Sequence, residues 1–128
     1  MMSYRDLDVY REAHALGLAC HRLSMQLPKY ELYETGSQLR RSSKSASANI
    51  VEGYGRRRYK AEYVRFLIFV HASCDETVEW LQYILDLYPD MEEFAQKTLD
   101  QANQVGSRLN RFISAVEAKH NEFKSLDS

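Results

Sequence analysis

The stretch YVRFLIFVHASCDETVEWLQYILDLY, residues 63–88, decides the fold. Its apolar and small side chains recur at alternating steps of four and three residues, which places them on one face of an α-helix and not on alternating faces of a strand. Pro89 follows directly and cannot continue the helix. The residues that we expect to face the core are Tyr63, Leu67, Val70, Cys74, Thr77, Leu81, Ile84 and Tyr88.

The same spacing recurs in three further segments. Together the four segments predict helices over residues 5–27, 36–53, 60–88 and 91–123. We expect them to form one domain of residues 1–128. Because the connections are short, consecutive helices should be antiparallel neighbours. The sequence therefore predicts an all-α, up-down-up-down four-helix bundle. Outside the third segment, the expected core positions are Val9, Ala13, Leu16, Cys20, Leu23, Leu27, Leu39, Ser43, Ala46, Ile50, Gly53, Thr98, Ala102, Val105, Leu109, Phe112 and Val116.

The composition supports this prediction. The chain has 128 residues, 45% of them hydrophobic, and its five Gly and two Pro are too few for the many turns of a β-sandwich. The N-terminal residues contain no apolar signal region and no segment approaches the length of a membrane span, so we expect a cytoplasmic protein.

Charge is unevenly distributed along the chain although the net charge is only −1. Residues 36–65 carry eight Lys or Arg against two acids, and residues 66–100 carry one Lys against eight acids. Such segregation predicts contacts with a polyanion, with another subunit or within the subunit.

The inventory of catalytic and metal-binding motifs points away from an enzyme. A di-metal bundle needs two Glu-x-x-His pairs, whereas this chain has one, Glu117 with His120. No glycine-rich phosphate loop, GxSxG or HExxH is present. We predict no catalytic residues, no metal and no cofactor; an enzyme that uses Asn49, Glu52 and nearby arginines is the less favoured alternative.

The second segment, residues 36–53, has two unusual features. Residues 42–48 are Ser, Ala and one Lys, small side chains that favour close packing against another helix. A polar stripe borders this face, and in it we expect Asn49 and Glu52 to bond to arginines of their own or a neighbouring subunit. A solvated face is the alternative. The stripe comprises Gln38, Arg41, Ser45, Asn49, Glu52 and Arg56.

The turn into the third segment is basic and aromatic. Four cations lie within five residues and are flanked by two tyrosines, so they could bind phosphates while the rings stack on bases. A solvated basic turn is the alternative. The predicted nucleic-acid contacts are Arg56, Arg57, Arg58 and Lys60, helped by Arg40, Arg41 and Lys44, with Tyr54 and Tyr59 as stacking residues.

These residues also carry a family resemblance. The run QLRR at 38–41, Ser45, and the run NIVEGYGR at 49–56, with Gly53 inside it, resemble the signature of bacterial four-helix-bundle proteins named for intervening sequences in 23S rRNA genes. More distantly, the chain is similar to accessory proteins of diversity-generating retroelements. The resemblance implies a ring-shaped homo-oligomer, usually a pentamer, and for the distant relatives nucleic-acid binding and a protein partner.

Two interpretations follow. In the first, a non-enzymatic oligomer binds RNA or DNA through the basic turn. In the second, the protein is a structural or protein-interaction scaffold. Residues 36–65, with a net charge of +6, then meet residues 66–100, with a net charge of −7, across a head-to-tail subunit interface.

Overall fold

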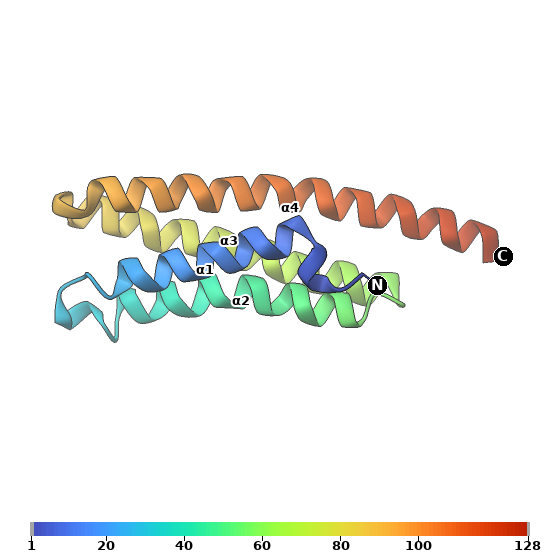
Figure 1. The fold of residues 1–128 in the computed structure, drawn as a ribbon, viewed down its shortest axis with the longest axis horizontal. Helices are drawn as coiled ribbons and strands as arrows, with labels where there is room; N and C mark the ends of the chain where they lie inside the picture. Colours follow the sequence, from blue (N-terminus) through green and yellow to red (C-terminus); the bar gives the residue numbers. More distant parts are fainter. Residues whose placement is uncertain (1, 128) are drawn as a thin grey trace.

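The computed structural model describes residues 2–127, with side chains to residue 119. Over these residues the chain is all-helical and contains no strand. Its four α-helices are α1 (Asp8–Ser24), α2 (Thr35–Gly55), α3 (Lys60–Leu87) and α4 (Glu92–Asp127). The helices lie lengthwise beside one another, and contacts join α1 to α2, α2 to α3, α3 to α4 and α1 to α4 (Figure 1).

The first helix is shorter than the predicted range of 5–27. Residues Tyr4–Asp6 form a separate 3-10 turn, because Ser3 and Asp6 cap each other through their side chains and backbone N–H groups. Leu7 is then extended, and α1 begins at Asp8. At the other end α1 stops at Ser24, and residues 25–27 form a turn ahead of Pro28.

The other helices follow the predicted ranges closely and differ at their ends by up to four residues. Thus α2 continues past Gly53, the residue at which we expected it to end. Among the described residues no glycine has the left-handed backbone that usually ends a helix, so Gly53 and Gly55 both stay helical. A second and a third 3-10 turn, Lys29–Glu31 and Pro89–Met91, precede α2 and α4.

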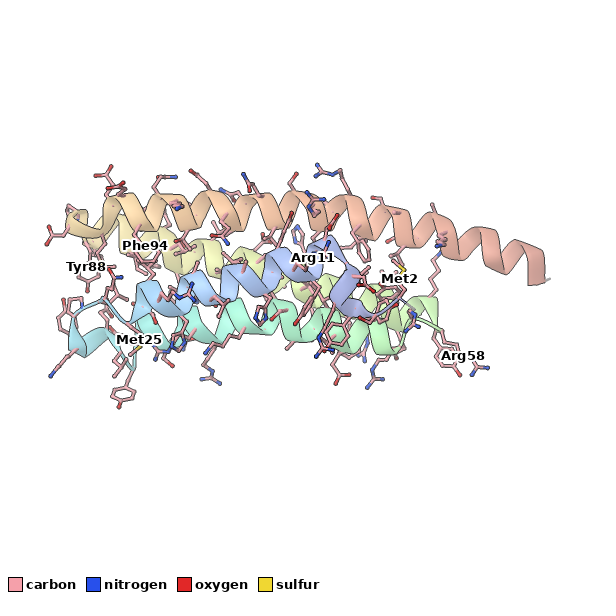
Figure 2. The ribbon with its side chains drawn as sticks, viewed as in Figure 1. Met2, Arg11, Met25, Arg58, Tyr88 and Phe94 are labelled. Atoms are coloured by element: carbon pink, nitrogen blue, oxygen red, sulfur yellow. The ribbon has the colours of Figure 1, made fainter. Side chains whose placement is uncertain are left out.

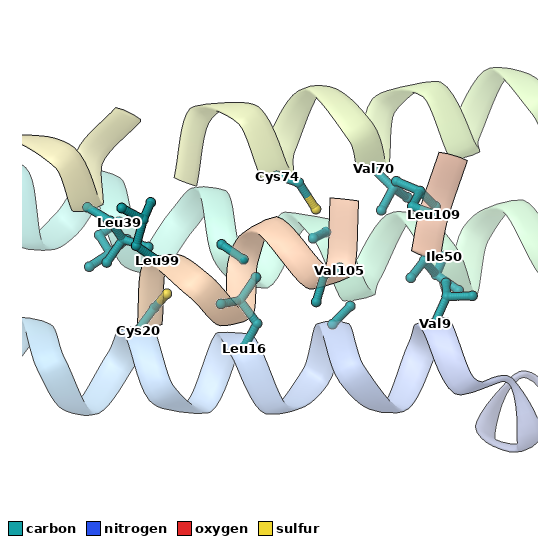
Figure 3. Packing of buried hydrophobic residues seen from close by; sticks show 14 of the residues in the cluster. Val9, Leu16, Cys20, Leu39, Ile50, Val70, Cys74, Leu99, Val105 and Leu109 are labelled. Carbon is teal, nitrogen blue, oxygen red and sulfur yellow. The ribbon is translucent and has the colours of Figure 1, made fainter. Parts of the chain in front are cut away.

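The core lies where the seven-residue pattern predicts. Every expected core position is buried except Tyr88 and Phe112, which are half-buried. Leu16, Leu39, Ile50 and Leu109 are fully covered. Figure 3 shows the buried side chains spread along the space between the helices, with Leu39 near Leu99 and Ile50 near Leu109. Burying a leucine or isoleucine of this kind contributes about 1.5–3 kcal/mol.

The small side chains of α2 form the predicted close packing surface against α3. Ser42 is buried with its Oγ 2.9 Å from Oγ1 of Thr77, and the Oγ of Ser45 lies 3.0 Å from the Oγ of Ser73. These hydroxyl pairs satisfy polar groups that would otherwise cost stability when buried. The packing interpretation of this serine-rich segment is confirmed.

No helix in the described part of the chain combines the length and apolarity needed to cross a membrane.

Candidate nucleic-acid interface

The predicted basic turn joins α2 to α3 at one end of the molecule. Arg56 to Tyr59 connect the two helices, and backbone bonds from Arg57 to Tyr54 and from Tyr59 to Arg56 fix the turn. The three arginines and Tyr59 are exposed, and Lys60 is half-buried as the first residue of α3. Figure 2 shows Arg58 at the tip of this end, far from Tyr88 at the other end.

Arg56 lies between two carboxylates. Its guanidinium lies 3.5 Å from a carboxylate oxygen of Glu52 and 3.8 Å from one of Glu62. It also lies 5.0 Å from the ring centre of Phe66. These contacts tie the end of α2 to the start of α3, so Arg56 primarily supports the turn.

Arg57 is held against the protein by an aromatic ring and a carbonyl. Its guanidinium carbon lies 4.0 Å from the ring centre of Tyr54, and Nη1 donates to the Tyr54 carbonyl at 2.9 Å. Tyr54 is half-buried and packs edge-on against Tyr63, with ring centres 6.5 Å apart. One face of the Tyr54 ring is therefore covered by Arg57.

Arg58 makes fewer contacts with the rest of the protein in this structure than Arg56 makes. Its guanidinium lies 5.9 Å from the ring centre of Tyr59, and both residues are exposed. Among the side chains that the structure describes, no carboxylate lies within ion-pair distance of Arg58. The guanidinium of Arg58 is therefore open to solvent.

The other predicted cationic contacts lie elsewhere on α2. Arg40 is 16 residues before Arg56, about 24 Å along the helix axis. It is half-buried and donates to the Oγ of Ser24 at 3.0 Å and to the Leu32 carbonyl at 2.6 Å. Arg40 thus fastens the α1–α2 connection.

Two further cations on α2 are exposed. Lys44 has its Nζ 3.0 Å from Nδ1 of His21, where the ammonium donates to the imidazole. Arg41 is exposed on the polar stripe. The structure does not bring Arg40, Arg41 and Lys44 together with the turn.

The polar stripe divides into separate local pairs. Asn49 donates to both the carbonyl and the Oγ of Ser45, each at 2.9 Å. Among the described side chains these bonds, and none with an arginine, are found for Asn49; its bond to an arginine of a neighbouring subunit stays a prediction. The bond predicted for Glu52 is present, with Arg56 as the partner. Gln38 and Arg41 are exposed.

Gly53 packs against α3 and takes no part in the side-chain hydrogen bonds of the polar stripe, because it has no side chain. A Cβ added there would lie 3.0 Å from Cβ of Phe66 and 3.4 Å from the Tyr63 ring. Gly53 thereby lets α2 and α3 approach closely beside the basic turn.

A second surface runs along the outside of α3. In the sequence Phe66, Phe69 and Trp80 lie outside the core pattern, and the exposed side chains of Tyr83 and Leu87 extend this surface. Phe69, Tyr83 and Leu87 are 41%, 50% and 58% exposed. The signal was a second series of apolar side chains, offset from the core series, at residues 69, 80, 83 and 87. We call Phe69, the half-buried Trp80, Tyr83 and Leu87 the outer stripe.

The groove between α3 and α4 encloses about 320 Å³. His71 and Asp75 line it, with His71 Nδ1 3.3 Å from the Asp75 carboxylate, and Asn103 and Gly106 of α4 face them. In the part of the chain that the structure describes, no three His, Cys, Asp or Glu side chains gather as metal ligands. The side chain of His120, half of the Glu117 pair, lies outside the described residues.

The two cysteines are buried in the core and unpaired with each other. Burial raises the pKa of the Cys20 thiol to about 12 and that of Cys74 to about 11. Both therefore stay protonated at neutral pH, and a thiol in this form is a poor nucleophile.

Comparison with known proteins agrees with the family resemblance. A solved protein of unknown function from the S23 ribosomal protein family of Bacteroides thetaiotaomicron superimposes with a TM-score of 0.74 and 18% identity, over 82% of this chain and 97% of that one. No curated protein matches the chain significantly. The sequence profile of the 23S rRNA-intervening sequence proteins matches residues 5–111. This chain therefore belongs to the family of 23S rRNA-intervening sequence proteins.

Proposed function

We propose that this protein binds RNA or DNA through the basic turn and catalyses no reaction. The observation that carries the proposal is Arg58, an exposed cation with no carboxylate near it among the described side chains. An arginine in this setting can donate two parallel hydrogen bonds to a phosphate. A phosphate-rich polymer would satisfy it without breaking an internal ion pair.

The other predicted contacts would have different roles in this proposal. Arg57 and Lys60 flank Arg58 and would add phosphate contacts at the turn. Arg56 would hold the turn in place, because two carboxylates already neutralise it. Arg41 and Lys44 could extend the path of a bound polymer along α2, whereas Arg40 is engaged internally.

The test is a fluorescence anisotropy titration of the purified protein against labelled RNA and DNA at several salt concentrations. Three phosphate contacts predict that log K falls with log salt at a slope of about −2 to −3. Arg57→Glu with Arg58→Glu should abolish binding at moderate salt. A matched pair of charge reversals at the opposite end, Arg22→Glu with Lys29→Glu, should leave most of the affinity.

Two outcomes would contradict the proposal. One is that the wild-type protein shows no binding even at low salt. The other is that the control pair weakens binding as much as the pair at the turn does, because the attraction would then be general and not located at the turn.

We also propose that the four helices form an antiparallel bundle that assembles into a ring, with the outer stripe covered by a second copy. The stripe supports this because large exposed apolar patches mark contact surfaces. Charge supports it too, since residues 36–65 carry a net charge of +6 and residues 66–100 one of −7, and opposite charges would attract across a head-to-tail interface between unlike faces. In the scaffold alternative this assembly is the whole function.

Light scattering after gel filtration tests the assembly. Phe69→Asp with Tyr83→Asp should reduce the mass to that of one subunit of 15.0 kDa. Asn103→Asp with Asn110→Asp, at polar positions on α4, is the control and should keep the wild-type mass. A monomeric wild-type protein would contradict the assembly, and an oligomer without nucleic-acid affinity would favour the scaffold.

A further inference from the structure

We propose that the basic turn selects single-stranded over double-stranded nucleic acid, and that Tyr59 is the ring on which an unpaired base stacks. This inference rests on the proposed function and adds to it the class of ligand and the role of one side chain.

The structure distinguishes the two tyrosines that flank the turn. Tyr54 is half-buried, one face of its ring is covered by Arg57, and its surroundings include Tyr63. Tyr59 is 63% exposed and immediately precedes α3. Tyr59 can therefore offer a ring face to a base, whereas Tyr54 acts as the support for Arg57.

Tyr59 also stands directly beside the uncompensated cation. The Arg58 guanidinium lies 5.9 Å from the centre of its ring, loosely enough that both groups remain exposed. A nucleotide presents its base and its phosphate side by side. One nucleotide can thus place its phosphate on Arg58 while its base stacks on Tyr59.

Duplexes would gain only part of this interaction. Their bases are already stacked on one another, so Tyr59 would find a free base face only at a duplex end. The turn is also a short connection between two helices and presents no helix or hairpin of its own to enter a groove. Stacking tolerates any base, so the preference should be for strandedness and not for sequence.

The experiment compares a labelled single-stranded DNA with a duplex that has the same number of phosphates. This duplex is closed into a hairpin at both ends by base-free linkers, so that it offers neither an unpaired base nor a free end. The wild-type protein should bind the single strand more tightly. Tyr59→Leu should weaken single-strand binding about 5- to 100-fold and leave duplex binding unchanged. Tyr59→Phe keeps the ring and should keep most of the affinity.

Two controls separate stacking from charge and folding. Tyr33→Leu removes another highly exposed tyrosine, near the opposite end, and should have no effect on binding. A single strand of abasic residues keeps the phosphates without the bases, so the wild-type protein should bind it as weakly as Tyr59→Leu binds the normal strand.

The outcomes distinguish this inference from the proposed function. If the wild-type protein binds the strand and the hairpin equally, and Tyr59→Leu changes neither affinity, the stacking role is overturned while binding through the turn stands. If the wild-type protein binds neither ligand at low salt, the proposed function itself fails. Equal wild-type affinity for normal and abasic strands would also overturn stacking.

Discussion

The two ends of the helices use their polar side chains in opposite ways. At the end that contains Tyr88, polar groups bind one another inside the protein: the buried Glu31 accepts a hydrogen bond from the Tyr88 hydroxyl at 2.6 Å, and Arg40 donates to the Ser24 hydroxyl. At the basic turn Arg58 is exposed and has no such partner among the described side chains. The comparison teaches that a charged residue near a helix end can serve either folding or binding, and that its contacts decide which.

The charge on Glu31 illustrates the folding role. Burial acts to raise the pKa of Glu31, but hydrogen bonds from Tyr88 and Thr35 outweigh burial and hold that pKa below the ordinary value of 4.5. The bond to Glu31 in turn raises the pKa of the Tyr88 hydroxyl. The ionised carboxylate is therefore part of the folded structure.

Removal of the hydroxyl of Tyr88 should lower the free energy of unfolding more than any other change considered below. Tyr88→Phe keeps the ring but deprives a buried carboxylate of its closest donor, which should cost about 1.5–3 kcal/mol of unfolding free energy. Urea denaturation at pH 7 measures this loss. An unchanged free energy would mean that water replaces the hydroxyl at no cost.

Acidification should reduce the difference in unfolding free energy between the wild-type protein and Tyr88→Phe. Because the folded pKa of Glu31 lies below the unfolded one, its contribution is present above about pH 4.5 and is lost as the pH falls through the folded pKa. The unfolding free energy of the wild-type protein should therefore approach that of Tyr88→Phe on acidification. If the difference between the two unfolding free energies stays constant from pH 7 to pH 3, the ionised Glu31 is not its cause.

A methyl group at Gly36 should have the next largest effect. Gly36 is the second residue of α2 and lies beside the same cluster, where an added Cβ would lie 2.7 Å from the Glu31 carbonyl oxygen and 3.1 Å from the Arg40 guanidinium. A backbone atom cannot move aside cheaply, so Gly36→Ala should cost about 1–3 kcal/mol. Thermal unfolding monitored by circular dichroism would show a lower midpoint; an unchanged one would mean that the cluster repacks freely.

An alanine at Gly55, at the other end of α2, should raise the stability of the protein instead of lowering it. Gly55 closes α2 beside the basic turn, its backbone is not left-handed, and an added Cβ would meet nothing within 4 Å. Gly55→Ala should therefore stabilise the protein by about 0.4–1 kcal/mol, because alanine loses less freedom on folding. The same unfolding assay measures it, and a loss of stability would show that the turn needs glycine.

The sequence predicted the helices and their buried faces because these depend on local periodicity. Every expected core position except Tyr88 and Phe112 is buried. It did not predict that α1 begins at Asp8, since a capped turn at residues 4–6 competes with the helix. Nor could it predict the burial of Glu31, whose partner Tyr88 is 57 residues away in the chain.

The candidate site was predicted as a set of residues but not as an arrangement. Spacing placed Arg56, Arg57 and Arg58 together, and the structure agrees. Their different roles depend on neighbours from α3, above all Glu62, which lies 3.8 Å from the guanidinium of Arg56. The two tyrosines likewise look equivalent in the sequence, but in the structure Tyr54 is half-buried against Tyr63 and Arg57, whereas Tyr59 is exposed.

The smallest effect on folding should come from Arg58, the residue on which the proposed binding mainly rests. Arg58→Glu removes an exposed side chain whose only described contact is the Tyr59 ring, so the unfolding free energy should change by no more than about 0.5 kcal/mol. Arg40→Gln is the matched comparison, because it leaves Ser24 and the Leu32 carbonyl without a cationic donor and should cost more. Urea denaturation of both variants measures the contrast. A loss above 1 kcal/mol for Arg58→Glu would place that arginine in the structural network, and the difference between the two ends would then disappear.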